Sequence, residues 1–369
     1  MHSLYNDQLA QEDDNEIPIL PFFSSVSSAL YRQRRNTMPA LPRNLSDVNL
    51  LGSWTETIDG RPFLLLSDGV HNKILAFSTL EQLQALQTAD TVYMDGTFTS
   101  CPDLWDQVYI LHARAGSTSY PLVFTLLPDR QAATYARLFR LLKTEVQQRL
   151  NRPLAPTRIQ TDFELAAIRA VEEEFPLTII KGCYFHYCQA LWRKVQHLGL
   201  AVPYKEDPRV QQFIRRAASL ALLPPNRVQG VWLDVMNSSP DGRRIEDFKD
   251  FMVINWVDDD ARFPLPLWNH HETEGPRTNN SLEGFHCRLN QSLPHRHPNI
   301  FRFIEVIRSI EHAERSKLVQ VNFEAAPPSR KRVYREIDNR IIRLNDHLRL
   351  GQKTPVQFLD AVDHLLKLA

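Results

Sequence analysis

The pattern of hydrophobic and polar positions divides the chain into an α/β part and a helical part. Two short apolar segments between residues 61 and 79, separated by Asp68 and Gly69, predict a pair of strands around a turn. Three further apolar runs follow, written TVYMD, VYILHA and PLVFTLL. Their length and their content of β-branched and aromatic residues predict a three-stranded meander.

Helices and strands alternate in the next part of the chain. Apolar side chains recur at helical spacing between residues 135 and 150, which predicts an amphipathic helix packed on the sheet. RIQTD predicts a fourth strand, a short alanine-containing helix follows, and TIIKGC predicts a fifth strand before a helix that begins near Tyr184. The predicted order from residue 91 is therefore β-β-β-α-β-α-β-α, which is an α/β fold.

Strand signals fade after about residue 200. PRVQQFIRRAASLALL and RRIEDFKDFMVINWV have helical spacing with charged faces, and three more helical stretches follow, the last of them rich in arginine. We therefore expect six segments: a flexible N-terminal segment at 1–50, a short β/α lead-in at 51–90, the first part of the core at 91–199, a helical insertion at 200–270, the last part of the core at 271–325 and a basic helical tail at 326–369.

Composition and charge indicate an ordinary globular chain. Hydrophobic residues make up 43% and charged residues 23%, and the 43 basic side chains balance 43 acidic ones. This balance argues against a surface built to coat nucleic acid, although residues 276–369 carry 16 basic and 10 acidic side chains. We see no secretory signal and no membrane span, and the four irregularly spaced cysteines favour a reducing compartment over a disulfide framework.

Two aspartates stand at equivalent places in the pattern. Asp95 ends TVYMD and Asp162 ends RIQTD, so two strands that are commonly neighbours in such a sheet each deliver a carboxylate at their end. Two adjacent carboxylates resist ionisation unless a cation joins them, and Mg²⁺ prefers oxygen ligands. The alternative is that each aspartate only stabilises the turn or helix that follows it.

A third carboxylate and a cysteine–histidine group are the other candidates. Glu283 in TNNSLEGFH is expected to complete a metal site, or else to form a capping box with Asn280 as N-cap. Cys183, His186 and Cys188 are spaced like half of a zinc site, but a closed site needs four ligands, so packing at a strand-to-helix junction is favoured. No glycine-rich phosphate loop and no nucleophile elbow is present in the sequence.

Four motifs in order resemble the catalytic domain of a Mutator-like element (MULE) transposase. They are MDGTF at 94–98, TDFELAAIRAVEEEFP at 161–176, KGCYFHYCQALWRKVQHLGL at 181–200 and TNNSLEGFHCRLNQSLPHRHPNI at 278–300. The resemblance implies an RNase H-like mixed sheet flanked by helices, with an all-helical insertion before the last catalytic helix. It also implies a DDE triad of Asp95, Asp162 and Glu283, with Cys183 and His186 as a supporting C-x-x-H motif.

The implied activity is DNA transposition in the nucleus, with strand cleavage and strand transfer at one site that holds two Mg²⁺ or Mn²⁺ ions. The implied partners are element-end and target DNA and further copies of the chain, without a membrane or a small-molecule cofactor. Relatives commonly carry an N-terminal zinc-binding module, which residues 1–50 lack the cysteines to build. A catalytically silent or domesticated descendant that binds DNA or protein is therefore the alternative.

The arginine-rich tail has two interpretations. Apolar residues of its helix lie on one stripe, so the helix is expected either to contact DNA phosphates or to dock on the core with a solvated charged face. The candidate DNA contacts are Arg330, Lys331, Arg332 and Arg335.

Overall fold

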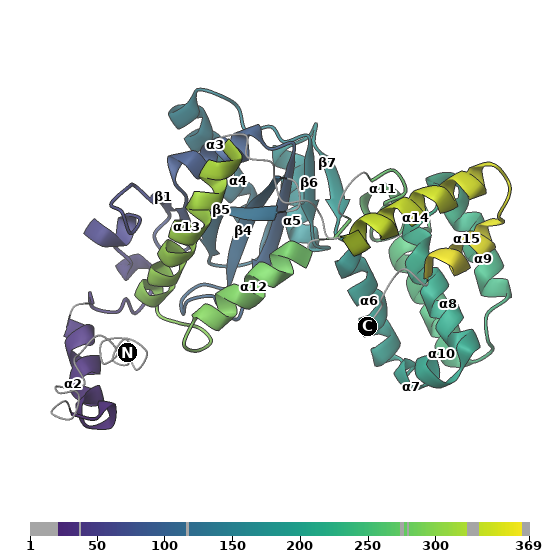
Figure 1. The fold of residues 1–369 in the computed structure, drawn as a ribbon, viewed down its shortest axis with the longest axis horizontal. Helices are drawn as coiled ribbons and strands as arrows, with labels where there is room; N and C mark the ends of the chain where they lie inside the picture. Colours follow the sequence, from purple (N-terminus) through teal and green to yellow (C-terminus); the bar gives the residue numbers. More distant parts are fainter. Residues whose placement is uncertain are drawn as a thin grey trace.

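The computed structural model describes residues 21–36, 38–115, 118–273, 277–278, 280–322 and 332–363. These residues form an α/β core built on one sheet and an all-helical lobe beside it (Figure 1). Within these ranges, every helix is too short or too polar to cross a bilayer.

A seven-stranded mixed sheet forms the centre of the core, in the order β1-β2-β5-β4-β3-β6-β7. Strands β1 to β5 pair antiparallel along this order, whereas β6 and β7 run parallel to β3. The predicted meander and the two strands after it are confirmed, and β1 and β2 extend the same sheet. The strands are β1 Leu64–Asp68, β2 Ile74–Phe77, β3 Thr91–Thr97, β4 Gln107–Ala115, β5 Thr118–Leu127, β6 Arg158–Thr161 and β7 Ile179–Gly182.

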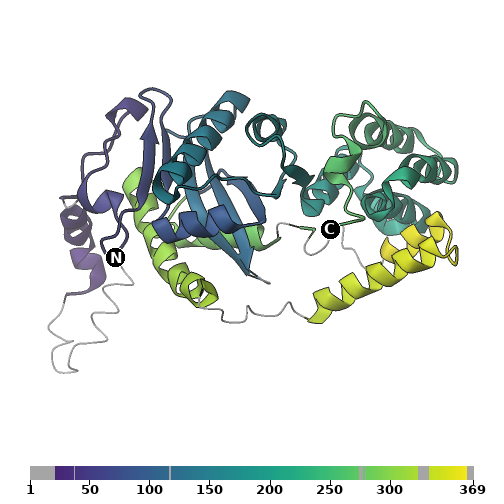
Figure 2. The ribbon, with the colours of Figure 1, turned by 90° about the horizontal axis from the view of Figure 1, so that it is seen from above.

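Helices cover both faces of the sheet (Figure 2). The helices α3 Leu80–Thr88, α4 Ala132–Leu150 and α5 Leu165–Glu174 bury their apolar stripes in one cluster. The helices α12 Asn280–Ser292 and α13 Ile300–Asn322 lie on the opposite face in a second cluster. This arrangement confirms an α/β fold consistent with the RNase H-like class.

The helical lobe lies beside the β7 edge of the sheet and is reached through α6, Tyr184–His197 (Figure 1). Residues 200–270 are helical, as the pattern predicts, although α7 and α9 are not individually expected from it. The elements are α7 Ala201–Glu206, α8 Pro208–Ser219, α9 Val228–Asn237, α10 Arg243–Met252, a π-helical turn η6 Val253–Val257 and α11 Leu265–Trp268.

The tail docks on this lobe. The helix α14, Arg332–Arg349, buries Ile341, Leu344 and Leu348 in the apolar cluster of the lobe, and α15, Pro355–Asp363, packs beside it. Arg216 of α8 holds Asp360 of α15 through an ion pair of 2.6 Å. The docking interpretation of the tail is therefore confirmed for α14, and its outward arginines remain exposed.

Structure near the N-terminus begins earlier than expected. The helix α2 covers Phe23–Asn36 and lies apart from the core in Figure 1, and the buried side chains of Val48 and Leu50 pack with α12 and α13. Burial of these two apolar residues ties the chain to the core before residue 51, so the expectation of a flexible segment extending to residue 50 is wrong for this part. Residues 1–20 lie outside the described ranges. Short 3₁₀ turns complete the elements: η2 Leu45–Asp47, η3 Gly52–Thr55, η4 Leu220–Leu222 and η5 Pro225–Arg227.

Candidate active site

The parallel pairing of β3 and β6 sets two aspartates side by side. Tyr93 pairs with Gln160, and continuing this register by two residues puts Asp95 level with Asp162. The predicted adjacency of these strands is confirmed. Asp95 lies inside β3, which continues to Thr97, whereas Asp162 directly follows the last residue of β6.

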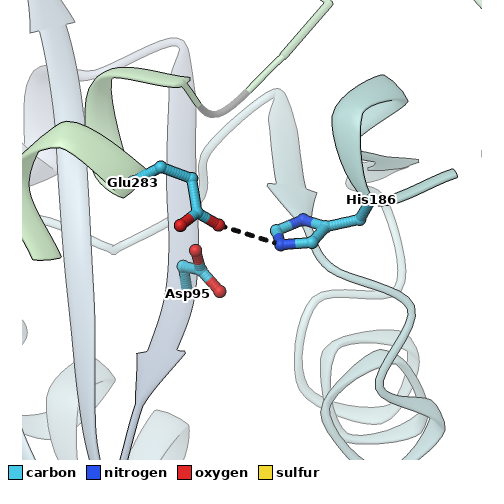
Figure 3. Close-up of side chains that lie close together, drawn as sticks. All are labelled: Asp95, His186 and Glu283. Carbon is cyan, nitrogen blue, oxygen red and sulfur yellow. Dashed lines mark ion pairs between the residues drawn. The ribbon is translucent and has the colours of Figure 1, made fainter. Parts of the chain in front are cut away.

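Two helices bring further side chains to this edge of the sheet. His186 lies in the first turn of α6 and Glu283 in the first turn of α12. Figure 3 shows Asp95, His186 and Glu283 pointing toward one another, with His186 Nε2 3.1 Å from Glu283 Oε1. One nitrogen or oxygen atom from each of the three lies within 4.8 Å of those of the other two.

These side chains line a cleft of about 830 Å³ between α6, α12 and the end of β3, where His186 and Glu283 come from the first turns of their helices. All three acids predicted from the sequence, Asp95, Asp162 and Glu283, line it. Lining residues further along the two helices, and after α12, are polar or basic. They include Gln189, Arg193, Asn290, Gln291, His295 and Arg296.

Asp95 is buried, and only one of its two carboxylate oxygens is hydrogen-bonded among the described residues. Only 3% of the residue is exposed, and Oδ1 accepts a hydrogen bond of 2.9 Å from the backbone N–H of Gly96. Among the described residues Oδ2 has no hydrogen-bond partner, and Nδ1 of His286 lies 3.7 Å from it. Burial raises the pKa of Asp95 to about 8, the charges of Asp162 and Glu283 add to the increase, and His186 opposes it.

His186 compensates part of this negative charge. Burial alone would lower its pKa, but hydrogen bonds to Cys183 and Glu283 and the charge of Asp95 outweigh burial and raise the pKa to about 11. The hydrogen bond from His186 holds the pKa of Glu283 below its ordinary value although burial opposes this. Burial lowers the pKa of His286 to about 4, so this second imidazole is neutral at pH 7.

Asp162 stabilises the turn that follows it and also lines the cleft. Its Oδ1 accepts a hydrogen bond of 3.2 Å from the backbone N–H of Glu164, which stabilises the turn before α5. Burial raises the pKa of Asp162, against the charge of His186 and the hydrogen bond from Glu164. The turn-stabilising role therefore coexists with a place in the cleft.

The capping-box alternative for Glu283 depends on the side chain of Asn280, which lies outside the described part of the structure. The carboxylate of Glu283 contacts His186 of α6.

The cysteines of the cysteine–histidine group are buried. Cys183 directly precedes α6 and is hydrogen-bonded to His186, and Cys188 lies in the apolar cluster of the helical lobe. The cluster able to hold a metal among the described residues combines His186 with Asp95 and Glu283 and contains neither cysteine. The two cysteines are therefore not part of a zinc site among the described residues.

Several lining residues are absent from the sequence-based expectations. His186, Gln189 and Arg193 follow one another at spacings of three and four, as residues on one helix face do. Glu283, Cys287, Asn290 and Gln291 repeat this on α12. The helical spacing was readable, but nothing in it shows that the two faces meet across a cleft.

Two of the four predicted DNA contacts, Arg332 and Arg335, lie in the described part of the chain, and neither lines the cleft. Arg330 and Lys331 fall outside the described residues. Arg332 and Arg335 lie exposed in the first turn of α14, where Arg332 forms an ion pair of 2.6 Å with Glu336.

The cluster fits a divalent cation. The buried Oδ2 of Asp95 lacks a hydrogen-bond donor, and a bound cation would satisfy it. Carboxylate oxygens and an imidazole nitrogen are ordinary ligands of divalent ions. Ionisation of Asp95 at neutral pH would also be favoured by a nearby positive charge.

Comparison with curated proteins finds no match to this chain. Residues 91–190 match the family model described as MULE transposase domain. The matched range runs from β3 into α6 and includes Asp95, Asp162 and His186, whereas Glu283 lies outside it. This match supports a MULE-type transposase.

Proposed function

We propose that this chain is a DDE-type transposase that cleaves and joins DNA strands by metal-dependent phosphoryl transfer. The observation that carries the proposal is the presence of Asp95, Asp162 and Glu283, which are far apart in the sequence, in the lining of one cleft. The match to a transposase domain gives this cluster its substrate class, DNA.

The proposed ligands are the three acids. Asp95, whose Oδ2 has no hydrogen-bond partner among the described residues, would hold Mg²⁺ or Mn²⁺ together with Asp162 and Glu283. A metal held there would supply Lewis-acid activation of a water or a 3′-hydroxyl and charge stabilisation of the leaving oxygen. The hydrogen bond from Gly96 fixes the orientation of Asp95, which keeps the site ready before substrate binds.

The polar and basic part of the cleft lining is the proposed path of the DNA strand. Arg193 on α6 and Arg296 after α12 provide fixed positive charge, and Gln189 and Asn290 provide amide groups for phosphate and sugar oxygens. A strand held between them would place a phosphodiester over the carboxylates. Phosphoryl transfer depends mainly on such positioning and on charge stabilisation.

The exposed arginines Arg332 and Arg335 of α14 remain proposed contacts for DNA outside the cleft. We also propose that the chain acts as a homo-oligomer in the nucleus, as the family resemblance implies.

A catalytically silent descendant is the second candidate. It would keep the fold and the cleft but not cleave DNA. The matched range of the family model, residues 91–190, does not reach Glu283. The third acid is therefore assigned only from its motif and from its position in the cleft, so the silent descendant needs a direct test.

The first prediction tests catalysis. Wild-type protein is incubated with supercoiled plasmid, and separately with a 3′-hydroxyl oligonucleotide and plasmid, in Mn²⁺ or Mg²⁺. We expect metal-dependent nicking and strand joining, and a loss of at least about 10³-fold in Asp95→Asn, because the loss of one metal-binding carboxylate removes several kcal/mol of charge stabilisation.

Asp90→Asn is the matched control, because Asp90 directly precedes the opposite end of the same strand. It should retain activity, and both variants should show wild-type circular dichroism. Wild-type protein that binds DNA and Mn²⁺ but neither nicks nor joins strands would establish the silent descendant instead.

A further inference from the structure

The cluster in the cleft differs from an all-carboxylate site by one imidazole. Asp95, His186 and Glu283 are the three residues whose ligand atoms gather within 4.8 Å, whereas Asp162 is not part of that group. Figure 3 shows the imidazole of His186 reaching across from α6 to the two carboxylates. A histidine that only stabilised the acids without facing the cleft would not occupy this position.

The distance between the ligand atoms of His186 and Glu283 suits binding of both to one ion. Nε2 of His186 lies 3.1 Å from Oε1 of Glu283. Two donors bound at about 2.1 Å to one ion, at right angles to each other, are about 3 Å apart. The distance between these two atoms suits a hydrogen bond in the metal-free protein and shared binding of one ion in the metal-bound protein. The two side chains therefore need to move little when Nε2 loses its proton and a metal binds.

The fold holds His186 in this orientation. Tyr184 and Tyr187, its neighbours on α6, donate hydrogen bonds from their hydroxyls to the backbone carbonyls of Ala218 and Ala217. These bonds fasten the first turn of α6 to α8. Nδ1 of His186 is shut off from solvent, so Nε2 is the ring nitrogen presented to the cleft.

Asp162 is less free to occupy the same position. One of its carboxylate oxygens accepts the backbone N–H of Glu164 and thereby serves the turn after β6. Its carboxylate also lines the cleft, so it remains available to a metal there.

We propose that His186 is a direct metal ligand, which together with Asp95 and Glu283 forms a mixed imidazole–carboxylate site for a divalent first-row transition ion. This inference rests on the proposed metal-dependent function and adds a ligand that the three-acid scheme does not contain. Mg²⁺ takes oxygen ligands, whereas an imidazole nitrogen shifts the preference toward transition ions. The chain should therefore bind Mn²⁺ more tightly than Mg²⁺ at this site.

Electron spin-echo envelope modulation of bound Mn²⁺ tests the ligand directly, on the full chain without DNA. A coordinated imidazole nitrogen gives a characteristic ¹⁴N coupling. We expect this coupling in wild type and in His286→Gln, which removes a second histidine of the cleft lining, and its loss in His186→Gln. The Mn²⁺ dissociation constant should rise at least about tenfold in His186→Gln, and the dissociation constant for Mg²⁺ should rise less.

The outcomes separate the two proposals. If Mn²⁺ binds wild type with an affinity that depends on Asp95 but without nitrogen coupling, His186 is not a ligand while the metal-dependent function stands. If Mn²⁺ does not bind, or binds Asp95→Asn equally well, the metal site itself is wrong. The spectrum of wild type decides the point even if a histidine variant fails to fold.

Discussion

Asp95 carries the largest electrostatic cost in the site. A buried carboxylate is unfavourable in its charged form, and this one has only Gly96 as hydrogen-bond donor to one oxygen. A residue that serves only the fold would be expected to find partners for both oxygens. The unsatisfied oxygen is therefore better explained by a ligand than by stability.

The raised pKa values of Asp95 and His186 predict how stability depends on pH and metal. Both values are higher in the folded chain than in the unfolded one, so the folded state binds more protons, and its free energy of unfolding falls as pH rises. For Asp95 this fall runs from about pH 4 to its folded pKa of about 8. For His186 the stabilisation is complete below about pH 6.5 and is lost as pH approaches about 11.

We therefore expect the melting temperature of the metal-free protein to decrease between pH 6.5 and 8. In Asp95→Asn the free energy of unfolding should fall less steeply with pH than in wild type. The difference in slope should be at most about 1.4 kcal/mol per pH unit, which is the contribution of one titrating proton. Because Mn²⁺ competes with these protons, its stabilising effect should grow over the same interval. Thermal denaturation with and without Mn²⁺ measures this, and an equal shift at pH 6 and pH 8 would contradict it.

The acids of the site were predictable from local pattern, whereas His186 was implied only as part of a supporting C-x-x-H motif and its position beside the acids was not predictable. Asp95 and Asp162 follow apolar strand patterns directly, and parallel strands end at one edge of a sheet, so local pattern and general topology suffice. The position of His186 depends on how α6 leaves β7 and crosses the cleft toward α12. That crossing is fixed by contacts with residues some thirty positions along the chain, such as Ala217 and Ala218, which no local pattern reveals.

At the scale of elements, the end of β7 joins the core to the helical lobe. The backbone carbonyl of Gly182 bonds Nε2 of His270 at 2.8 Å, and Lys181 donates to the backbone carbonyls of Pro266 and Asn269. Phe163 packs over Gly182 and makes ring contacts with Trp256 and Phe263 in the lobe. Since α6 and His186 follow directly, this junction sets the position of the site.

Gly182→Ala should loosen the junction. An added Cβ would lie 2.3 Å from the ring of Phe163, which is held by the aromatic residues of the lobe, so one of these groups must move. We expect a loss of about 1–3 kcal/mol in the free energy of unfolding, measured by urea denaturation. Combining it with Phe163→Leu should cost less than the sum of the two single changes, because the smaller side chain removes the clash.

Gly230→Ala is the matched control, since Gly230 lies exposed within α9 of the same lobe and an added Cβ there meets nothing within 4 Å. It should raise stability by up to about 1 kcal/mol. Equal changes in the free energy of unfolding in Gly182→Ala and Gly230→Ala would mean that Phe163 does not constrain β7.

The strands and long helices of the core were readable from periodicity, but the assembly of the lobe was not. The stripe of α14 indicated an amphipathic helix, yet its partner depends on long-range contacts with α8 and α15. The sequence also left Val48 and Leu50 outside the predicted core, because two isolated apolar residues have no period from which burial can be inferred.

At the scale of the whole molecule, charge is balanced overall but unevenly placed. The chain carries equal numbers of acidic and basic side chains, whereas the cleft lining combines carboxylates with arginines. Such an arrangement suits a strand that is held by its phosphates at the arginines and attacked beside the carboxylates. Local placement of charge, and not net charge, would then decide where DNA binds.

The salt dependence of DNA binding tests this path. In the Asp95→Asn background, which prevents cleavage, the logarithm of the dissociation constant is followed between about 50 and 200 mM salt. Each lost phosphate contact should lower the slope by about 0.7 for a single strand and about 0.9 for duplex DNA. We therefore expect Arg193→Gln and Arg296→Gln each to reduce the slope by roughly this amount. Arg152→Gln should leave it unchanged, because exposed Arg152 lies between α4 and the start of β6, at the strand end opposite Asp162. A reduction in Arg335→Gln as well would extend the path onto α14, whereas slopes for Arg193→Gln and Arg296→Gln equal to that of Arg152→Gln would exclude the cleft as the DNA-binding surface.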